Sequence, residues 1–168
     1  MRHFTLITTG GTIEKTYDEH SGVLDNRRSI VRRMLRRIRL EDSTISIIEL
    51  MSKDSLHMTD DDRERIAQTV RVAAACQPQP TGIIILHGTD TLCVTGDKLA
   101  NEVWKMPVIL TGAMRPFEMV RSDALQNLTE ALFAAGTLAP GVYCAAHGRA
   151  LKFPGVKKDR DRGTFLPA

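Results

Sequence analysis

Long hydrophobic runs are missing from this sequence, and none approaches the roughly 18–20 apolar residues that a membrane-spanning helix needs. The first residues, MRHFTLITTGG, are also too polar for a signal peptide. Cysteine is scarce, since Cys76, Cys93 and Cys144 are odd in number and never stand as C-x-x-C. This pattern disfavours a disulfide framework or a zinc site. It predicts reduced thiols in a cytoplasmic protein that does not associate with membranes.

Several signatures of catalysis are absent as well. The sequence has no G-x-x-x-x-G-K-[ST] phosphate loop, no G-x-G-x-x-G dinucleotide fingerprint and no G-x-S-x-G nucleophile elbow. His87 and His147 lack the spacing of a metal-binding pair, and we interpret both as core or loop-fixing residues. We therefore expect neither a metal nor a cofactor.

Composition is ordinary, but the positive charge is concentrated in one segment. With 42% hydrophobic and 26% charged side chains, the chain is expected to form one domain over residues 1–168. The net charge is +3, yet 16 basic residues face 20 acidic ones once seven clustered arginines are set aside. Apolar residues at helical spacing and a lack of interleaved aromatics favour a solvated or subunit-contact face over nucleic-acid binding. The seven are Arg27, Arg28, Arg32, Arg33, Arg36, Arg37 and Arg39.

Five short runs rich in Ile, Val and Leu predict strands buried on both faces, as in a parallel sheet. They cover residues 4–8, 45–50, 82–87, 107–112 and 142–146. Helical patterns lie between them at 29–40, 59–76, 92–104 and 122–136. Ser122 is the expected cap of the last helix and Gly136 its stop, and residues 147–168 are expected to form a loop or short hairpin. The alternation predicts an α/β fold, a three-layer sandwich around a mainly parallel, flavodoxin-like, doubly wound sheet.

Hydroxyl groups and glycines follow these strands, where ligands bind in open α/β sheets. The segments TTGGTI, MSKDS, HGTDT, TGAMRP and HGR come after the five strands in order. They bring Thr12, Ser52, Thr89, Asp90 and Arg115 to one edge, although Arg115 is interpreted as a donor to loop carbonyls. A threonine hydroxyl needs a base to become a nucleophile, and a lysine whose pKa is lowered can serve. The set therefore suits acyl transfer.

The motifs TTGGTI, HGTDT and TGAMRP, in this order and spacing, resemble the bacterial L-asparaginase family. The similarity covers the whole chain but only the N-terminal domain of the longer enzymes. The sequence thus looks like a short-chain member without the smaller C-terminal domain. The resemblance implies self-association to a dimer or tetramer.

The resemblance implies roles for individual residues. Thr12 matches the nucleophile, and Tyr17 matches a tyrosine that contacts it from a loop closing over the substrate. Thr89 and Asp90 match the second threonine and its aspartate, which also binds the substrate's α-amino group. Backbone N–H groups near Gly11 and Thr89 are candidates to stabilise the oxyanion.

Further matches concern the substrate clamp and the base. Ser52 matches the serine that binds the α-carboxylate, and Lys53 stands beside it where the longer enzymes have glutamine. Lys158 best matches the lysine that pairs with the second threonine and the aspartate, with Lys152 and Lys157 as alternatives. The lysine at position 53 departs from the family pattern and bears on substrate fit.

The implied reaction is hydrolysis of L-asparagine to L-aspartate and ammonia through a threonine acyl-enzyme, a double displacement. Two alternatives within amide chemistry are a dual asparaginase–glutaminase and an amidase that supplies ammonia to a partner. A third is a non-catalytic domain that binds an amino acid.

Overall fold

A computed structural model describes residues 1–167, built around a six-stranded sheet in the order β4-β1-β5-β6-β7-β8. The strands β4, β1, β5, β6 and β7 run parallel to one another, and β8 pairs antiparallel with β7 at the edge of the sheet. The parallel strands therefore follow the 2-1-3-4-5 order of flavodoxin-like sheets. All five predicted strands are present and the predicted fold class is confirmed. The sheet strands are β1 (Arg2–Gly10), β4 (Ser43–Lys53), β5 (Gly82–Leu86), β6 (Pro107–Thr111), β7 (Gly141–Ala146) and β8 (Arg149–Lys152).

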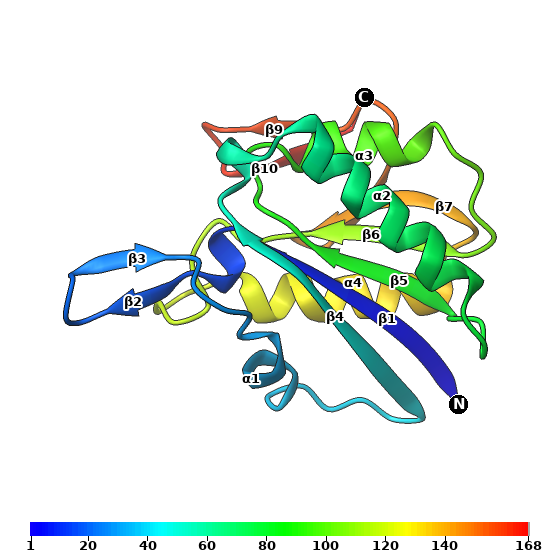
Figure 1. Cartoon of the computed structure of the whole chain (residues 1–168), viewed down its shortest axis with the longest axis horizontal. Helices are drawn as coiled ribbons and strands as arrows, with labels where there is room; N and C mark the ends of the chain where they lie inside the picture. Colours follow the sequence, from blue (N-terminus) through cyan, green and yellow to red (C-terminus); the bar gives the residue numbers. More distant parts are fainter. Residues whose placement is uncertain (168) are drawn as a thin grey trace.

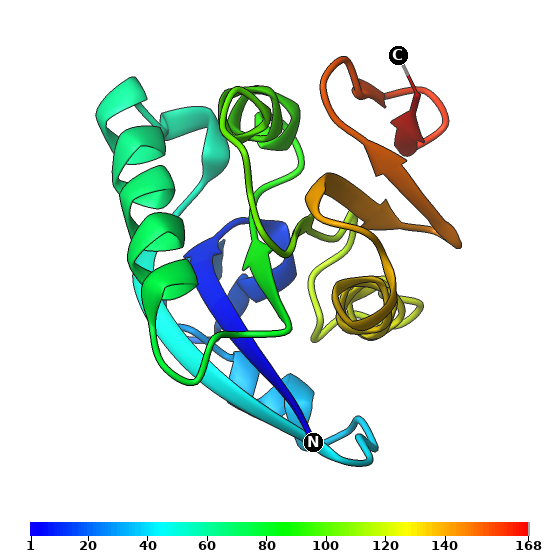
Figure 2. The ribbon, with the colours of Figure 1, turned by 90° about the vertical axis from the view of Figure 1, so that its right-hand side faces the viewer.

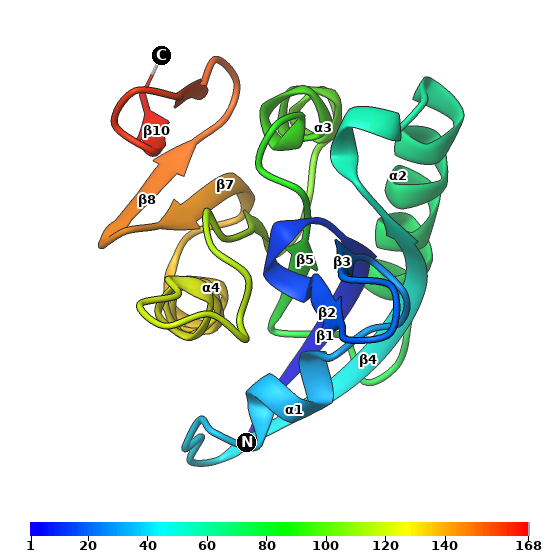
Figure 3. The same cartoon turned by 90° about the vertical axis from the view of Figure 1, so that its left-hand side faces the viewer.

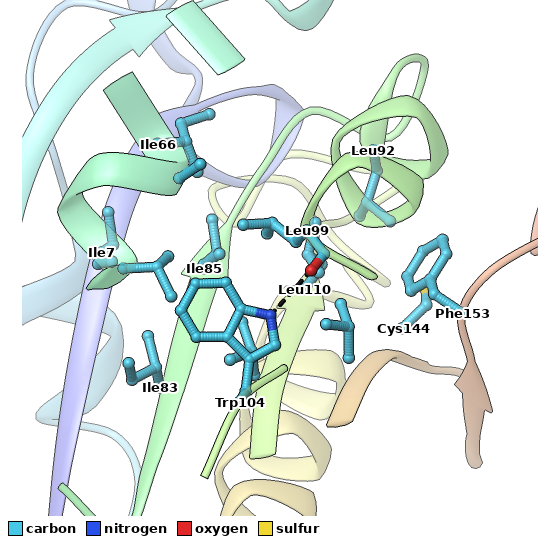
Figure 4. Packing of buried hydrophobic residues seen from close by; sticks show 14 of the residues in the cluster. Ile7, Ile66, Ile83, Ile85, Leu92, Leu99, Trp104, Leu110, Cys144 and Phe153 are labelled. Carbon is cyan, nitrogen blue, oxygen red and sulfur yellow. Dashed lines mark hydrogen bonds between the residues drawn. The ribbon is translucent and has the colours of Figure 1, made fainter. Parts of the chain in front are cut away.

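Helices cover both faces of the sheet, as Figures 2 and 3 show from opposite sides. The helices α2 (Asp60–Ala75) and α3 (Leu92–Ala100) lie on one face, and α1 (Val31–Leu35) and α4 (Ala124–Thr137) on the other. Because side chains alternate along a strand, Ile83 and Ile85 enter the first core while Ile84 enters the second. In the first core, the Trp104 indole N–H donates to the Leu99 carbonyl at 2.8 Å, which satisfies its only polar atom (Figure 4).

The predicted helix over 59–76 is confirmed as α2, with a reciprocal capping box at its start. Thr59 accepts from the Asp62 N–H while the Asp62 side chain accepts from the Thr59 N–H. The α4 boundaries were predicted less well. Asp123, not Ser122, is the N-cap, and the helix runs through Gly136 to Thr137.

The helix expected over 29–40 shrinks to the five residues of α1. Within that range, arginines stand at i and i+4, at 32 and 36 and at 33 and 37, so like charges repel one another. The N-cap residue is Ile30, whose apolar side chain cannot accept a hydrogen bond from the first N–H groups of the helix. The apolar side still packs, since Val31 and Met34 are buried.

Two small hairpins complete the fold (Figure 1). The first pairs β2 (Thr16–Asp18) with β3 (Val23–Asp25) and was not predicted; Gly22, with a φ of 67°, makes its turn. The second pairs β9 (Lys157–Asp159) with β10 (Thr164–Leu166), which fits the hairpin expected in the tail. Strand β8 in the same tail was missed, and Ala168 lies outside the described residues. The short 3₁₀ helices η1 (Thr12–Glu14) and η2 (Ser55–His57) follow β1 and β4.

Within residues 1–167, no helix is long and apolar enough to cross a membrane.

Close packing between α3 and the segment after β8 can be tested at Gly96. A Cβ added there would lie 2.2 Å from the ring of Phe153, which is buried. We expect Gly96→Ala to lower the free energy of unfolding by roughly 1–2 kcal/mol, because overpacking outweighs the gain in helix propensity. Urea unfolding measures the change, and Val94→Ala on the exposed side of α3 is the control. An unchanged or higher midpoint for Gly96→Ala would contradict the packing described.

Candidate functional site

Two backbone turns meet at the carboxyl ends of β1 and β5. Gly11 has a φ of 80°, and a Cβ on it would lie 2.4 Å from the Cα of Gly88. Gly10, with a φ of 98°, passes equally close to β4, where a Cβ would lie 2.5 Å from the Lys53 nitrogen. Both positions thus require glycine for conformation and for space. Thr12 and Thr89 each follow one of the two glycines in contact, so the structure brings the TTGGTI and HGTDT segments together.

Lys158 reaches this meeting point from β9. Its Nζ lies 2.8 Å from the Thr89 Oγ1 and 2.9 Å from the Asp90 Oδ1. Arg160, on the same hairpin, places a second cation 3.1 Å from that carboxylate oxygen. The lysine side chain is 16% exposed and Thr89 is buried, whereas the arginine side chain is 69% exposed. A hydroxyl, an amine and a carboxylate therefore form one hydrogen-bonded unit at the site.

The two alternative lysines are not part of this unit. Lys152 lies exposed at the end of β8, and Lys157 lies exposed at the start of β9. Of the three lysines, the structure brings only Lys158 to Thr89 and Asp90.

The end of β4 carries the residues expected to clamp a substrate. The pairing of β1 with β4 shifts between Thr8 and Gly10, so β4 has extra residues that include Ser52. The Lys53 Nζ lies 2.7 Å from a carboxylate oxygen of Asp62, so the lysine's charge is paired with an acid in the first turn of α2. The Lys53 carbonyl accepts from the Gly11 N–H at 2.9 Å. That N–H is therefore occupied. The next one, on Thr12 at the start of η1, has no acceptor within its own 3₁₀ helix.

Ser55 is a polar residue at this edge that the sequence analysis missed. It is buried, and a Cβ on Gly88 would lie 2.5 Å from its Oγ. Its carbonyl accepts from the Thr91 hydroxyl at 2.9 Å, so Ser55 contacts the HGTDT segment directly. Asp54 begins η2 as its N-cap and also pairs with Lys15 at 2.8 Å. No pattern in the sequence shows which way the Ser55 side chain points.

Tyr17 lies on β2 and is 60% exposed. Its hydroxyl lies near Gly22 of its own hairpin, where an added Cβ would come within 4.0 Å. Its N–H donates to Glu118 at 3.0 Å, and the Asn26 side chain after β3 donates to the Gly11 carbonyl at 2.8 Å. The hairpin is therefore tied at its base to the glycine turn, and the contact between Tyr17 and Thr12 stays a prediction.

Both histidines are held by neighbours, as expected. Burial lowers the pKa of His87 to about 4, so its ring is neutral, and its nitrogens contact the Gly88 carbonyl and the Thr95 hydroxyl at 2.8 Å each. His147 contacts Asp123 at 2.8 Å and Thr164 at 2.9 Å.

Arg115 differs from its expected role. Its backbone N–H donates to Asp123 at 3.0 Å, but its exposed guanidinium makes no hydrogen bond to a loop carbonyl among the residues described.

The arginine stripe is exposed and partly neutralised. Arg27 pairs with Asp18, and Arg33 pairs with Glu118 at 2.8 Å. The guanidinium groups of Arg33 and Arg37 also lie 5.3 and 5.2 Å from the centre of the Phe117 ring, within cation–π range. These contacts fit a solvated face that fixes the loop before α4.

Sequence comparison identifies relatives over most of the chain. An L-asparaginase from Thermococcus kodakarensis is 37% identical over 111 residues, covering 64% of this chain and 33% of that protein. L-asparaginase 1 of Escherichia coli K12 is 36% identical over 135 residues, covering 76% and 38%. One subunit of a glutamyl-tRNA(Gln) amidotransferase from Methanococcus vannielii is 28% identical over 157 residues, covering 88% and 35%. The chain thus spans about a third of the length of these three relatives.

Solved structures give the same picture. The thermostable L-asparaginase from Thermococcus kodakarensis superposes with a TM-score of 0.87 at 29% identity, over 98% of this chain and 51% of that one. L-asparaginase I from Vibrio cholerae superposes with a TM-score of 0.80 at 26% identity, with the same coverage. The family model described as "Asparaginase, N-terminal" matches residues 3–162. The chain therefore belongs to the asparaginase family and corresponds to its N-terminal domain.

Proposed function

We propose that this protein is an amidohydrolase that converts L-asparagine to L-aspartate and ammonia, with Thr12 as nucleophile. The observation that carries the proposal is the unit of Thr89, Lys158 and Asp90, joined at 2.8 and 2.9 Å, next to the contact between Gly11 and Gly88. Membership of the asparaginase family supports the same reaction class.

The reaction is a double displacement in which Thr12 first forms an ester. Its oxygen attacks the side-chain amide carbon, the C–N bond breaks, and the threonine proton leaves with ammonia. Water then attacks the ester, the bond between the acyl carbon and the Thr12 oxygen breaks, a proton from that water restores the Thr12 hydroxyl, and L-aspartate departs. The N–H of Thr12 is the donor we assign to the oxyanion, since that of Gly11 is bonded to Lys53.

The unit around Lys158 moves protons in this scheme. To accept a proton from Thr89, Lys158 must first become a neutral amine. Arg160 lies 3.1 Å from the Oδ1 of Asp90, so the lysine shares that carboxylate oxygen with a second cation. Thr89 and Lys158 then activate the attacking water.

Two groups hold the substrate so that its amide reaches Thr12. Both cations contact the Oδ1 of Asp90, and its Oδ2, with no hydrogen bond among residues 1–167, is the oxygen we assign to the α-ammonium. Ser52 is proposed for the α-carboxylate, with Ser55 as its neighbour. Two fixed points set the side-chain length that fits, and one methylene more, as in glutamine, is discriminated by only about 1–3 kcal/mol.

A second candidate is an amidase that supplies ammonia to a partner enzyme or acts on glutamine as well. The similarity to the amidotransferase protein over 88% of the chain favours it. Ammonia release measured with asparagine and with glutamine separates the candidates, because a ratio of kcat/KM near one would favour the dual activity. A third candidate, a non-catalytic amino-acid-binding domain, would show binding by calorimetry without turnover.

We also propose a cytoplasmic homo-oligomer. The three cysteines are free in the structure, and a solved neighbour is titled a probable cytoplasmic L-asparaginase, from Campylobacter jejuni.

The nucleophile is tested by Thr12→Val, which removes the hydroxyl at similar volume. We expect kcat for ammonia release to fall by at least about 10³-fold, because no ester forms. Thr129→Val on the exposed face of α4 is the matched control. Turnover of Thr12→Val at the wild-type rate would refute the assignment.

Lys158 is tested against the two lysines beside it. Lys158→Met should lower kcat about 10²–10⁴-fold by removing the proton acceptor, while Lys152→Met and Lys157→Met stay close to wild type. Steady-state kinetics on asparagine measure all three. An equal loss in all three variants would rule out a specific role for Lys158.

The carboxylate anchor is tested by Ser52→Ala and Ser55→Ala. Truncation of the serine that binds the α-carboxylate should raise KM about tenfold. The reason is the loss of one charge-assisted hydrogen bond, which contributes about 1.5 kcal/mol or more. We expect this for Ser52→Ala; the same result for Ser55→Ala alone would move the assignment to Ser55. Calorimetric titration with L-aspartate checks the change as a binding constant.

A further inference from the structure

A buried carboxyl group lies two residues beyond the proposed nucleophile and has no part in the scheme above. Glu14, at the end of η1, is 1% exposed. One carboxyl oxygen accepts from the Gly10 N–H at 3.2 Å, and the other is 2.5 Å from the Ser29 hydroxyl. Among residues 1–167, no cation pairs with it. A buried acid without a cation is costly to ionise, so its presence here needs a reason.

Glu14 joins two segments that the chain separates. Gly10 begins the glycine turn that presents Thr12, whereas Ser29 follows the β2–β3 hairpin that carries Tyr17. A second bond between the same segments runs from the Asn26 side chain to the Gly11 carbonyl. Among the residues that the structure describes, the carboxyl group is thus one of two links between the nucleophile turn and the base of the hairpin.

We propose that Glu14 is a positioning residue for Thr12, which holds the glycine turn against the base of the β2–β3 hairpin. The effect on turnover rests on the proposed function, since it acts through Thr12. The link between the two segments does not depend on it.

The charge state of this link changes near neutral pH. Burial raises the pKa of Glu14 to about 7, and hydrogen bonds from Ser29, Gly10 and Ile30 offset only part of that rise. Glu49 on β4 is the charged group that acts on it, and it raises the pKa further; Glu49 itself lies 3.7 Å from Arg32. When neutral, Glu14 can donate to Ser29 while accepting from Gly10. When ionised, it can only accept, so the bond to Ser29 must reverse.

Glu14→Gln and Glu14→Ala separate the link from the charge. Glutamine can accept from the Gly10 N–H and donate to Ser29, as the neutral acid does, whereas alanine makes neither bond. At pH 6 we expect kcat of Glu14→Ala to fall about tenfold to a hundredfold with KM within about twofold, because the attack geometry loosens while the clamp is intact. Glu14→Gln should stay within about threefold of wild type. Glu41→Gln, an exposed carboxyl, is the matched control.

Stability against pH gives a readout that does not require turnover. Because the pKa is higher in the folded state, about 7, than the ordinary value of 4.5, the neutral form favours folding. This contribution is complete below about pH 4.5 and is lost as the pH rises through 7. Between pH 4.5 and 7, the free energy of unfolding of wild type should fall with pH relative to that of Glu14→Gln. The slope should be close to that expected for one proton released on unfolding, measured by urea unfolding at several pH values.

Amide hydrogen exchange reports the link itself. Glu14→Ala should speed exchange by at least about tenfold both around Thr12 and around Ser29, and Glu14→Gln should restore protection at pH 6. Faster exchange in only one segment, or a Glu14→Ala enzyme with normal kcat, would overturn the proposal. If wild type releases no ammonia, the proposed function fails, and exchange in the two segments still decides whether Glu14 joins them.

Discussion

The contact between the backbones of Gly11 and Gly88 is the constraint on which the site depends. Two strands that are adjacent in the sheet end in turns that touch. A Cβ on Gly11 would clash with the backbone of Gly88, and a Cβ on Gly88 would clash with Ser55. The close approach of the two main chains uses the positive φ of Gly11, a conformation that glycine adopts without steric cost, and the lack of a side chain at Gly88. The contact brings the TTGGTI and HGTDT segments, which carry hydroxyl groups, together at one edge of the sheet.

Charge at this edge is organised in pairs and small groups. Lys53 is held by Asp62, Lys15 by Asp54, and Lys158 shares Asp90 with Arg160. Of these three groups, only the last includes a side chain of the HGTDT segment, Asp90. Lys15 pairs with the N-cap of η2, and Lys53 pairs with a residue in the first turn of α2. The departure at position 53 therefore need not repel an amino group, because its charge is already matched. Glu14 is the exception, a buried acid that has hydrogen bonds but no cation within the described part of the chain.

Much of the fold follows from sequence, for reasons that particular residues make clear. The parallel strands were predictable because both their faces are buried. The run GIIIL of β5 shows this, since it is short, wholly apolar and rich in β-branched isoleucine. The capping box of α2 was legible in Thr59 and the acids after it. By contrast, TYD and VLD are too short and polar to announce a hairpin, and the exposed RALK of β8 becomes a strand only because β7 offers an edge. Crowded arginines shortened α1, a repulsion that periodicity alone does not weigh.

The site was less predictable than the fold. Lys158 lies 69 positions beyond Thr89, so only a family resemblance selected it among three lysines. Ser55 was passed over because a hydroxyl near a strand end does not reveal which way it points until a cap fixes the turn. Glu14 gave no signal, since nothing in TTGGTIEK tells whether an acid in a short helix faces solvent or core.

The alternation of side chains along β5 and its neighbours divides the hydrophobic interior into two cores that share no residue. Helices α2 and α3 pack against one face of the sheet, and α1 and α4 pack against the other. Substitutions in opposite cores should therefore combine additively. Sequence drift in one helical layer need not be compensated in the other, so each layer can vary independently while the loops between them stay in register.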